Sequence, residues 1–289
     1  MITFVFPGQG SQKRGMGQGL FDEVREYAAV EKDVDAIVGY SMRRQCLEDP
    51  ENRLTQTQFT QPSLYVVNAL HYYKALAQGT QPAYLAGHSL GEYNALLAAG
   101  AFDFLTGLRL VRKRGELMSQ AKNGGMGAVI GLSASAIEKV IRGNGLSGLD
   151  VANFNSPSQI VVSGPVDDIK RAGATFEFAG AQMYIPLQVS AAFHSRYMAD
   201  AAKAFADFLA PMSFSTPRTP VIANATAQPY PTNGSDSIKQ LLVDQITHSV
   251  QWTGSIRYLM DRGVTQFVEM GPGNVLTRMV QQIQQQKDM

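Results

Sequence analysis

The chain contains a single cysteine, Cys46, among its 289 residues. One thiol excludes an intrachain disulfide framework and a cysteine-ligated metal cluster, and it is typical of a protein of the reducing cytoplasm. An excess of charge of one sign is also missing, because 25 basic side chains face 24 acidic ones. This balance gives no electrostatic reason to expect nucleic acid as a partner.

Long hydrophobic runs are missing as well. No apolar stretch approaches the length that spans a membrane, and the apolar start at residues 2–6 is too short and lacks the basic beginning of a signal peptide. Hydrophobic residues make up 45% of the chain and charged residues 17%, a globular balance that argues against disorder. We therefore expect one large folded domain, or two, without a membrane partner.

One stretch of the chain combines a short strand, a sharp turn and a helix. Residues 84–86 form an apolar run that is typical of a buried strand, and helix formers follow from Glu92. Between them, Gly87-x-Ser89-x-Gly91 has the pattern of a nucleophile elbow, in which the serine hydroxyl is exposed above the sheet edge. The N-terminus of the next helix then faces the reaction. The alternative for this pattern is a tight structural turn.

The pattern of strands and helices changes after Asn123-Gly124-Gly125. Between residues 126 and 187 the predicted order is strand, helix, strand, strand, helix, strand, which is that of a ferredoxin-like unit. On both sides of this module the segments predict a larger α/β domain. We therefore expect a small subdomain at residues 125–190, inserted into a large subdomain formed by residues 1–124 and 191–289.

A serine hydroxyl needs a base within hydrogen-bond reach, and the chain has four histidines. His88 is adjacent to Ser89 in the turn, where neighbouring side chains diverge. His71 lies inside a predicted helix, and His248 has no clear role. His194 follows a stretch of small residues where the chain returns to the large subdomain, so it is the candidate base. Its position alone leaves open whether it is catalytic.

No Asp or Glu presents itself as the third member of a triad. A backbone carbonyl orients an imidazole equally well, so we predict a dyad. The backbone N–H of Leu90, directly after the nucleophile, is the expected first donor to an oxyanion. The loop around Gln9, which follows the first predicted strand, is a candidate for the second donor.

Seven short segments occur in order along the chain: Phe6-Pro7-Gly8-Gln9-Gly10-Ser11-Gln12, Gly87-His88-Ser89-Leu90-Gly91-Glu92-Tyr93, Val111-Arg112-Lys113-Arg114-Gly115, Asn153-Phe154-Asn155-Ser156-Pro157, Phe193-His194-Ser195, Val250-Gln251-Trp252 and Glu269-Met270-Gly271-Pro272-Gly273. Together they make the chain resemble the malonyl-CoA:acyl carrier protein transacylases over almost its whole length. The resemblance implies an α/β fold, with an α/β-hydrolase-like large subdomain and an inserted ferredoxin-like small subdomain.

The resemblance also implies the catalytic roles. Ser89 would be the nucleophile and His194 the base. The main-chain carbonyl of Gln251 would orient the imidazole, which would explain the missing carboxylate. The backbone amides of Gln9 and Leu90 would form the oxyanion hole.

Substrate contacts are implied in the same way. Arg114 would hold the malonyl carboxylate through a bidentate pair, for which a guanidinium is suited. The alternative for Arg114 is an exposed residue of a basic helix face, because the two residues before it are also basic. Ala192-Phe193-His194 is similar to the Ala-Phe-His of malonyl-selective polyketide acyltransferases, in which a bulky Phe193 would leave little room for an α-methyl group. His88 and Asn155 are expected to be further substrate-binding residues.

The implied reaction is acyl transfer in two steps. Ser89 attacks the malonyl thioester, CoA leaves, and the phosphopantetheine thiol of an acyl carrier protein then takes the malonyl group. Malonyl-CoA and the carrier protein, or carrier domains of a polyketide synthase, are the expected partners of a monomer that needs no metal and no cofactor. Residues 39–68 resemble the discrete trans-acting acyltransferases of modular polyketide synthases more than the housekeeping fatty-acid enzyme.

Two other functions remain open at this point. The same serine and histidine would make an acyl-thioester hydrolase if water reached the acyl intermediate, although such an enzyme has no use for a buried Arg114. A non-catalytic module that recruits the carrier protein is the second, although a scaffold needs none of Ser89, His194 and Arg114.

Overall fold

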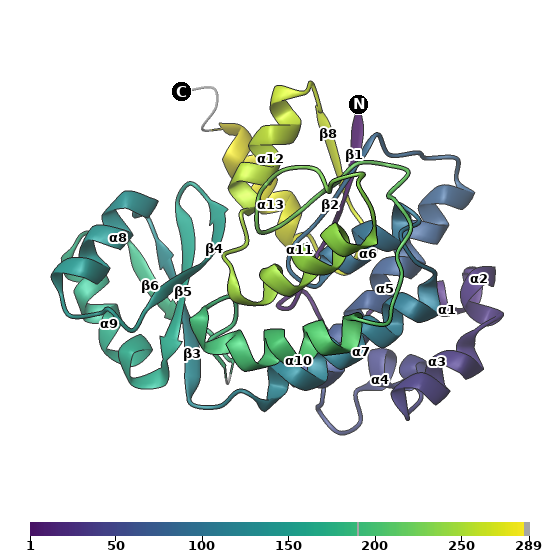
Figure 1. The fold of residues 1–289 in the computed structure, drawn as a ribbon, viewed down its shortest axis with the longest axis horizontal. Helices are drawn as coiled ribbons and strands as arrows, with labels where there is room; N and C mark the ends of the chain where they lie inside the picture. The colour runs from purple at the N-terminus through teal and green to yellow at the C-terminus, as the bar shows by residue number, and fades with distance from the viewer. Residues whose placement is uncertain (190, 286–289) are drawn as a thin grey trace.

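The structure is a computed structural model that describes residues 1–189 and 191–285. It contains one parallel and one antiparallel sheet, each of four strands, which lie in different parts of the molecule (Figure 1). The predicted α/β fold with two subdomains is confirmed. The predicted boundary at residue 190 lies outside the described residues. Among the residues that the structure describes, no helix is long and apolar enough to cross a membrane.

The parallel sheet organises the large subdomain. Its order is β7-β2-β1-β8, built from β1 (Ile2–Phe6), β2 (Tyr84–Gly87), β7 (Val221–Ile222) and β8 (Gln266–Glu269). Side chains of β1 alternate between two hydrophobic clusters. Phe4 and Phe6 pack in the cluster that includes the helices α5 (Thr57–Ala77) and α7 (Phe104–Gln120), whereas Val5 packs with α12 (Trp252–Asp261) and α13 (Val275–Gln285). Helices thus cover both faces, as a parallel sheet requires.

The small subdomain has the predicted order of elements. It contains β3 (Gly124–Ile130), α8 (Ala134–Gly143), β4 (Asp150–Ser156), β5 (Gln159–Pro165), α9 (Val166–Phe178) and β6 (Met183–Pro186). The strands pair antiparallel in the order β4-β5-β3-β6, and both helices pack against this sheet (Figure 1, teal). These strands do not extend the parallel sheet, so the expectation of a separate module is confirmed.

The remaining helices belong to the large subdomain. They are α1 (Leu20–Glu23), α2 (Arg25–Ala28), α3 (Glu31–Val38), α4 (Met42–Glu48), α6 (Gly91–Ala98), the 3-10 helix η1 (Arg196–Met198), α10 (Ala199–Leu209) and α11 (Ser235–Thr247).

One helix start differs from the sequence pattern. Pro62 predicts a helix that begins there, because proline is favoured in the first turn, whereas α5 already begins at Thr57. One local and one tertiary contact stabilise the additional turn. The hydroxyl of Thr60 donates to the main-chain oxygen of Leu54 at 2.6 Å, and Gly115 of α7 lets that helix approach the carbonyl of Thr57. Gln61 therefore lies in the helix rather than in a loop.

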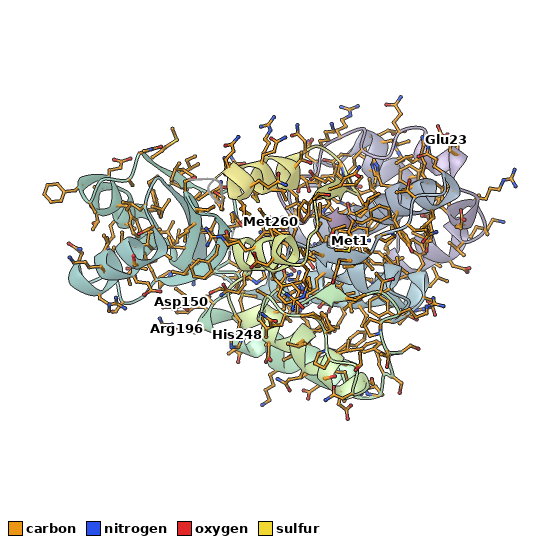
Figure 2. The ribbon with its side chains drawn as sticks, turned by 90° about the horizontal axis from the view of Figure 1, so that it is seen from above. Met1, Glu23, Asp150, Arg196, His248 and Met260 are labelled. Atoms are coloured by element: carbon orange, nitrogen blue, oxygen red, sulfur yellow. The ribbon has the colours of Figure 1, made fainter. Side chains whose placement is uncertain are left out.

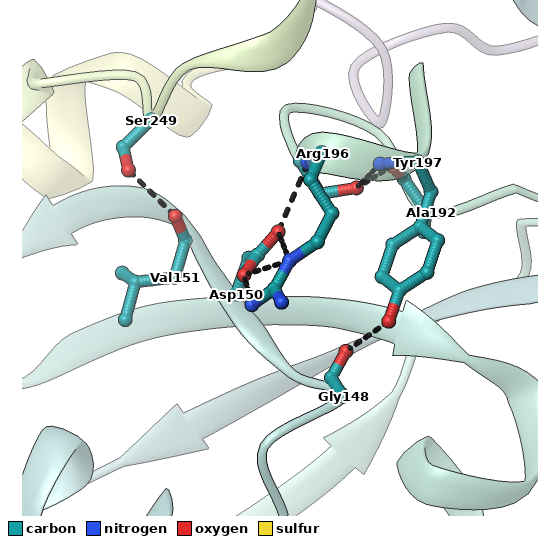
Figure 3. A network of polar contacts seen from close by, with 8 residues as sticks. Gly148, Asp150, Val151, Ala192, Arg196, Tyr197 and Ser249 are labelled. Carbon is teal, nitrogen blue, oxygen red and sulfur yellow. Dashed lines mark hydrogen bonds and ion pairs between the residues drawn. The ribbon is translucent and has the colours of Figure 1, made fainter. Parts of the chain in front are cut away.

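Hydrogen bonds join β4 of the small subdomain to the large one. Val250 donates to the main-chain oxygen of Ala152 at 2.8 Å and accepts from Phe154 N–H at 2.9 Å. Asp150 pairs with Arg196, and these two residues lie near His248 (Figure 2). Figure 3 shows this ion pair beside two further links, from Ser249 Oγ to Val151 and from the Tyr197 hydroxyl to Gly148. This seam fixes the small subdomain relative to the segment that follows His194.

Candidate active site

The turn at Ser89 has the geometry of a nucleophile elbow. Ser89 adopts a positive φ of 49°, a strained conformation for a residue with a side chain. A Cβ at Gly87 would lie 2.0 Å from the carbonyl carbon of Gly91, and a Cβ at Gly91 would lie 1.9 Å from the carbonyl oxygen of Phe6. Both glycines are therefore required by close backbone contact. The predicted elbow is the actual local structure, with Ser89 just before α6.

His194 is the histidine that reaches the nucleophile. Its Nε2 lies 2.8 Å from Ser89 Oγ, and its Nδ1 lies 2.8 Å from the main-chain oxygen of Gln245. Because that carbonyl only accepts, Nδ1 carries the proton, and Nε2 is free to accept the proton of the Ser89 hydroxyl. Burial, and after it the charge of Arg114, lowers the pKa of His194 to about 3. The imidazole is therefore neutral at physiological pH, which is the form that a base requires.

The group that orients His194 is not the expected one. Gln251 is the N-cap residue of α12, and its carbonyl accepts Ser255 N–H at 2.8 Å and the Ser255 hydroxyl at 2.9 Å. Gln245 lies in the last turn of α11, where helix carbonyls lack an intrahelical partner. Its oxygen is therefore available to His194, and the negative end of the helix dipole favours an imidazolium there. The assignment to Gln251 is wrong, and the carbonyl belongs to Gln245.

Two backbone N–H groups are available for an oxyanion. Within residues 1–189 and 191–285, neither the N–H of Leu90 nor that of Gln9 donates a hydrogen bond. The loop that carries Gln9 is close to the elbow, since a Cβ at Gly8 would lie 2.4 Å from the carbonyl oxygen of His88. Both N–H groups belong to residues that line the same cavity as Ser89. This arrangement is compatible with an oxyanion hole, and its assignment to these amides stays a prediction.

Arg114 lies beside the nucleophile and is not an exposed helix residue. Its side chain is 1% exposed, and its Nη2 donates to Ser89 Oγ at 3.1 Å and to Gln245 Oε1 at 2.8 Å. The guanidinium also lies over the ring of Tyr93, 5.6 Å from its centroid. Its Nε is buried without a partner, and among the described residues no carboxylate makes an ion pair with it. A buried guanidinium with free donors beside a serine suits an anionic substrate group.

The other predicted substrate residues also line the cavity at Ser89. Phe193 is 6% exposed and contributes its ring to the wall. Nε2 of His88 lies 2.8 Å from Oδ1 of Asn155, so this pair connects the elbow with β4 of the small subdomain. Whether His88 and Asn155 contact a substrate stays a prediction. The cavity is thus formed by both subdomains, with Ser89 between them.

Comparison with known proteins identifies the family. A sequence profile described as "Acyl transferase domain" matches residues 3–289. The chain belongs to the acyl transferase domain family. It is 55% identical to the "Polyketide biosynthesis malonyl CoA-acyl carrier protein transacylase PksC" of Bacillus subtilis, over 98% of this chain and 97% of that protein.

Solved structures agree with this assignment. A malonyl CoA-acyl carrier protein transacylase from Burkholderia pseudomallei superimposes with a TM-score of 0.93 at 48% identity, covering 99% of this chain and 98% of that one. A malonyl-transacylase in complex with its type II PKS acyl-carrier protein superimposes with a TM-score of 0.92 at 34% identity, covering 98% and 92%. The two-subdomain architecture is therefore that of known acyl transferases.

Three polar residues of this acyl transferase site were not predicted from sequence. Asn224 accepts Ser89 N–H at 2.6 Å and donates to the Gly87 carbonyl at 2.6 Å, so it holds the elbow from both sides. Its position two residues after the buried strand β7, at the carboxyl edge of a parallel sheet, is a signal that sequence alone offers. Gln61 lines the cavity with a buried Oε1 that has no partner. Gln245 contacts His194 through its main-chain oxygen. Every residue has such an oxygen, so the sequence carries no signal for this role.

The low pKa of His194 has a measurable consequence. A free imidazole titrates near pH 6.5, whereas burial lowers the pKa of His194 to about 3, so His194 is neutral at about pH 5 and above. We expect the rate of Ser89 acylation by acetyl-CoA to show no loss from protonation of the base between about pH 8 and pH 5. Acetyl-CoA is chosen because its acyl group has no titrating carboxylate. Rapid-quench mass spectrometry measures this rate, and a fall with an apparent pKa near 6.5 would contradict the assignment.

Proposed function

We infer that this acyl transferase moves a malonyl group from malonyl-CoA to the phosphopantetheine thiol of an acyl carrier protein. The observation that carries this inference is Arg114, a fully buried cation with unused donors beside Ser89. Acetyl and other uncharged acyl groups offer nothing to such a cation, whereas the free carboxylate of a malonyl group completes its hydrogen bonds. The name of the Bacillus subtilis relative supports the same substrate.

The proposed reaction uses Ser89 twice. In the first step, Ser89 Oγ attacks the thioester carbonyl while its proton passes to His194 Nε2, across the 2.8 Å hydrogen bond. The oxyanion is stabilised by the N–H groups of Gln9 and Leu90 and by the N-terminus of α6. The C–S bond then breaks, and the imidazolium returns its proton to the CoA thiolate.

The second step reverses the first with another thiol. The phosphopantetheine thiol gives its proton to His194 and attacks the malonyl ester of Ser89, and the serine recovers its proton as the ester breaks. Side chains and backbone amides supply every group that this proposal requires, so it needs neither a metal nor a resident cofactor. One chain contributes all of them, so the proposed active unit is a monomer.

The proposed context is polyketide synthesis. The Bacillus subtilis relative carries a polyketide name, and a related malonyl-transacylase has been solved with a type II PKS acyl-carrier protein. Residues 39–68 support the same context through their resemblance to discrete trans-acting acyltransferases. A fatty-acid role and a proofreading hydrolase are the less favoured alternatives. Since CoA thioesters and carrier proteins are the reactants, the proposed compartment is the cytoplasm.

A chase experiment separates the transferase from the hydrolase. The protein is loaded with malonyl-CoA, freed of CoA, and then incubated with or without a carrier protein that bears phosphopantetheine. Intact-protein mass spectrometry follows the malonyl mass. We expect the malonyl mass to move to the carrier in the first sample. Over the same time, the protein in the sample without carrier should keep it. Loss of the malonyl mass to water at the same rate in both samples would favour the hydrolase.

The size of Phe193 predicts selectivity at the acyl α-carbon. Its buried ring lines the cavity next to His194, so we expect Phe193→Ser to make room for the additional methyl of methylmalonyl. One methyl group in an apolar pocket is worth about 1–3 kcal/mol, so the ratio of methylmalonyl to malonyl transfer is expected to rise roughly 10- to 100-fold. Competition between the two CoA thioesters measures this ratio. An unchanged ratio would show that Phe193 does not limit the pocket.

A further inference from the structure

A buried carboxylate that takes no part in acyl transfer lies beneath the nucleophile. Glu92 is in the first turn of α6 and is 0% exposed. Its Oε1 accepts the Tyr230 hydroxyl at 2.5 Å and the N–H of Asn224 at 3.3 Å, and its Oε2 accepts from Nε2 of Gln245. No cation within residues 1–189 and 191–285 makes a direct ion pair with it. Since burial of a carboxylate is costly, this position calls for a reason.

Gln245 connects this carboxylate with Ser89, His194 and Arg114. Its Nε2 donates to Glu92 and also to the main-chain oxygen of Ser89 at 2.8 Å. Its Oε1 accepts from Nη2 of Arg114 at 2.8 Å. Its main-chain oxygen accepts from Nδ1 of His194 at 2.8 Å. One residue therefore contacts the nucleophile, the base and the cation that faces the substrate.

Two groups that only accept fix the nitrogen end of the Gln245 amide, the main-chain oxygen of Ser89 and the ionised carboxylate of Glu92. An amide has one end that donates and one that accepts, whereas an ionised carboxylate only accepts. Glu92 can therefore face only the nitrogen of Gln245, and the oxygen must then face Arg114. With the amide reversed, its nitrogen would point at a guanidinium that also only donates, and its oxygen would point at the carboxylate.

We propose that Glu92 is a positioning residue that fixes the amide of Gln245, so that the amide oxygen holds Arg114 in place for the carboxylate of the acyl group. This inference rests on the proposed malonyl transfer. It extends the site by a chain of contacts from Glu92 through Gln245 to Arg114, in which the anion and the cation never touch.

The charge of Glu92 sets the conditions of the test. Burial raises the pKa of Glu92 to about 7, while its three donors and the charge of Arg114 oppose this increase. The titratable groups that face it are Arg114 from α7, Tyr93 from α6 and Tyr230 from the loop before α11. Measurements at about pH 8 therefore keep the carboxylate mostly ionised.

Two variants remove the chain of contacts at different points. In Glu92→Gln, either orientation of the new amide brings its nitrogen against another donor, Nε2 of Gln245 or the N–H of Asn224. Gln245→Met removes the amide but keeps the main-chain oxygen for His194. Since hydrogen bonds to charged groups are the strong ones, we expect each variant to lower malonyl loading of Ser89 roughly 10- to 100-fold relative to acetyl loading.

The double variant distinguishes positioning from a direct effect. If Glu92 acts through Gln245, Glu92→Gln combined with Gln245→Met lowers the malonyl-to-acetyl ratio no further than the more damaging single variant. Multiplicative losses would overturn the proposal, as would a ratio that Glu92→Gln leaves unchanged. Should Glu92→Gln fail to fold, Gln245→Met alone decides, because an unchanged ratio there removes the proposed route to Arg114.

Tyr230→Phe is the matched control. It removes one donor to Glu92 but leaves the bond between Glu92 and Gln245. Because loss of this donor raises the pKa of Glu92 further, the malonyl-to-acetyl ratio of this variant and of the wild type is measured at about pH 9. We expect an unchanged ratio there together with a lower melting temperature. A shift of the ratio as large as that of Glu92→Gln would overturn the proposal. If the wild type loads acetyl as well as malonyl, the proposed function fails. If the wild type prefers malonyl and Glu92→Gln keeps that preference, only the role of Glu92 fails.

Discussion

Ser89→Ala is expected to abolish the malonyl adduct that malonyl-CoA leaves on the protein. The elbow places Ser89 Oγ 2.8 Å from Nε2 of His194, which can take its proton, and 3.1 Å from Nη2 of Arg114. Ser89 is therefore the hydroxyl that we expect to carry the malonyl group. His194→Ala should retain the adduct but slow its formation about 10²- to 10⁴-fold, the usual contribution of a general base. Intact-protein mass spectrometry after brief exposure to malonyl-CoA measures both effects.

A histidine elsewhere on the chain serves as the control. His248 is exposed, and its side chain contacts Thr247 and the main-chain oxygen of Asp244 rather than Ser89. We expect His248→Ala to load malonyl at the rate of the wild type. An adduct that survives Ser89→Ala would show that another residue is the nucleophile. Equal losses in His194→Ala and His248→Ala would mean that His194 is not the base.

Arg114→Ala is expected to separate malonyl from acetyl transfer. The variant leaves the malonyl carboxylate in a buried site without its partner, a loss of about 2–5 kcal/mol, or roughly 30- to 4,000-fold in loading of Ser89. Acetyl loading should change far less, because an acetyl group offers no anion to the guanidinium. Arg114→Lys should recover little, since an ammonium cannot reproduce the bidentate geometry. Malonyl and acetyl loading of the same variant are compared by mass spectrometry.

The control for this variant lies on the same helix. Arg112 is exposed on α7, two residues before Arg114, so Arg112→Ala removes a cation without entering the cavity. We expect it to leave the malonyl-to-acetyl ratio unchanged. Equal losses of malonyl and acetyl loading in Arg114→Ala would mean that the guanidinium supports the fold rather than the acyl carboxylate. The proposed function would then rest on Phe193 and on the comparisons.

Local patterns predicted much of the fold. The glycines of Gly87-x-Ser89-x-Gly91 indicate a backbone that must approach other backbone closely, and the structure has contacts near 2 Å for a Cβ at either position. The order of elements between residues 126 and 187 identified the small subdomain, because strand and helix periods are properties of neighbouring residues. The helix start predicted from Pro62 is wrong. Contacts with Leu54 and α7 add a helical turn before it, which helix propensity alone does not predict.

The side chains of the site were predicted from the sequence, but the groups that hold them in place were not. Only four histidines competed for the role of base, and resemblance to a known family chose His194 and Arg114. Resemblance also predicted that the carbonyl of Gln251 orients His194. In the structure this carbonyl accepts hydrogen bonds from Ser255 in the first turn of α12. A main-chain oxygen is common to every residue, so sequence cannot say which one becomes free where a helix ends.

What the sequence alone determined is therefore the elbow with Ser89, the inserted module and a short set of candidates for base and cation. Tertiary structure decided how these groups are held. Ser89 and His194 are 105 positions apart in the chain, and Gln245 Nε2 reaches the carbonyl of Ser89 across 156 positions. The network of Glu92, Gln245 and Asn224 forms only when these distant segments pack together, because each member is satisfied by partners that its own neighbours in sequence do not supply.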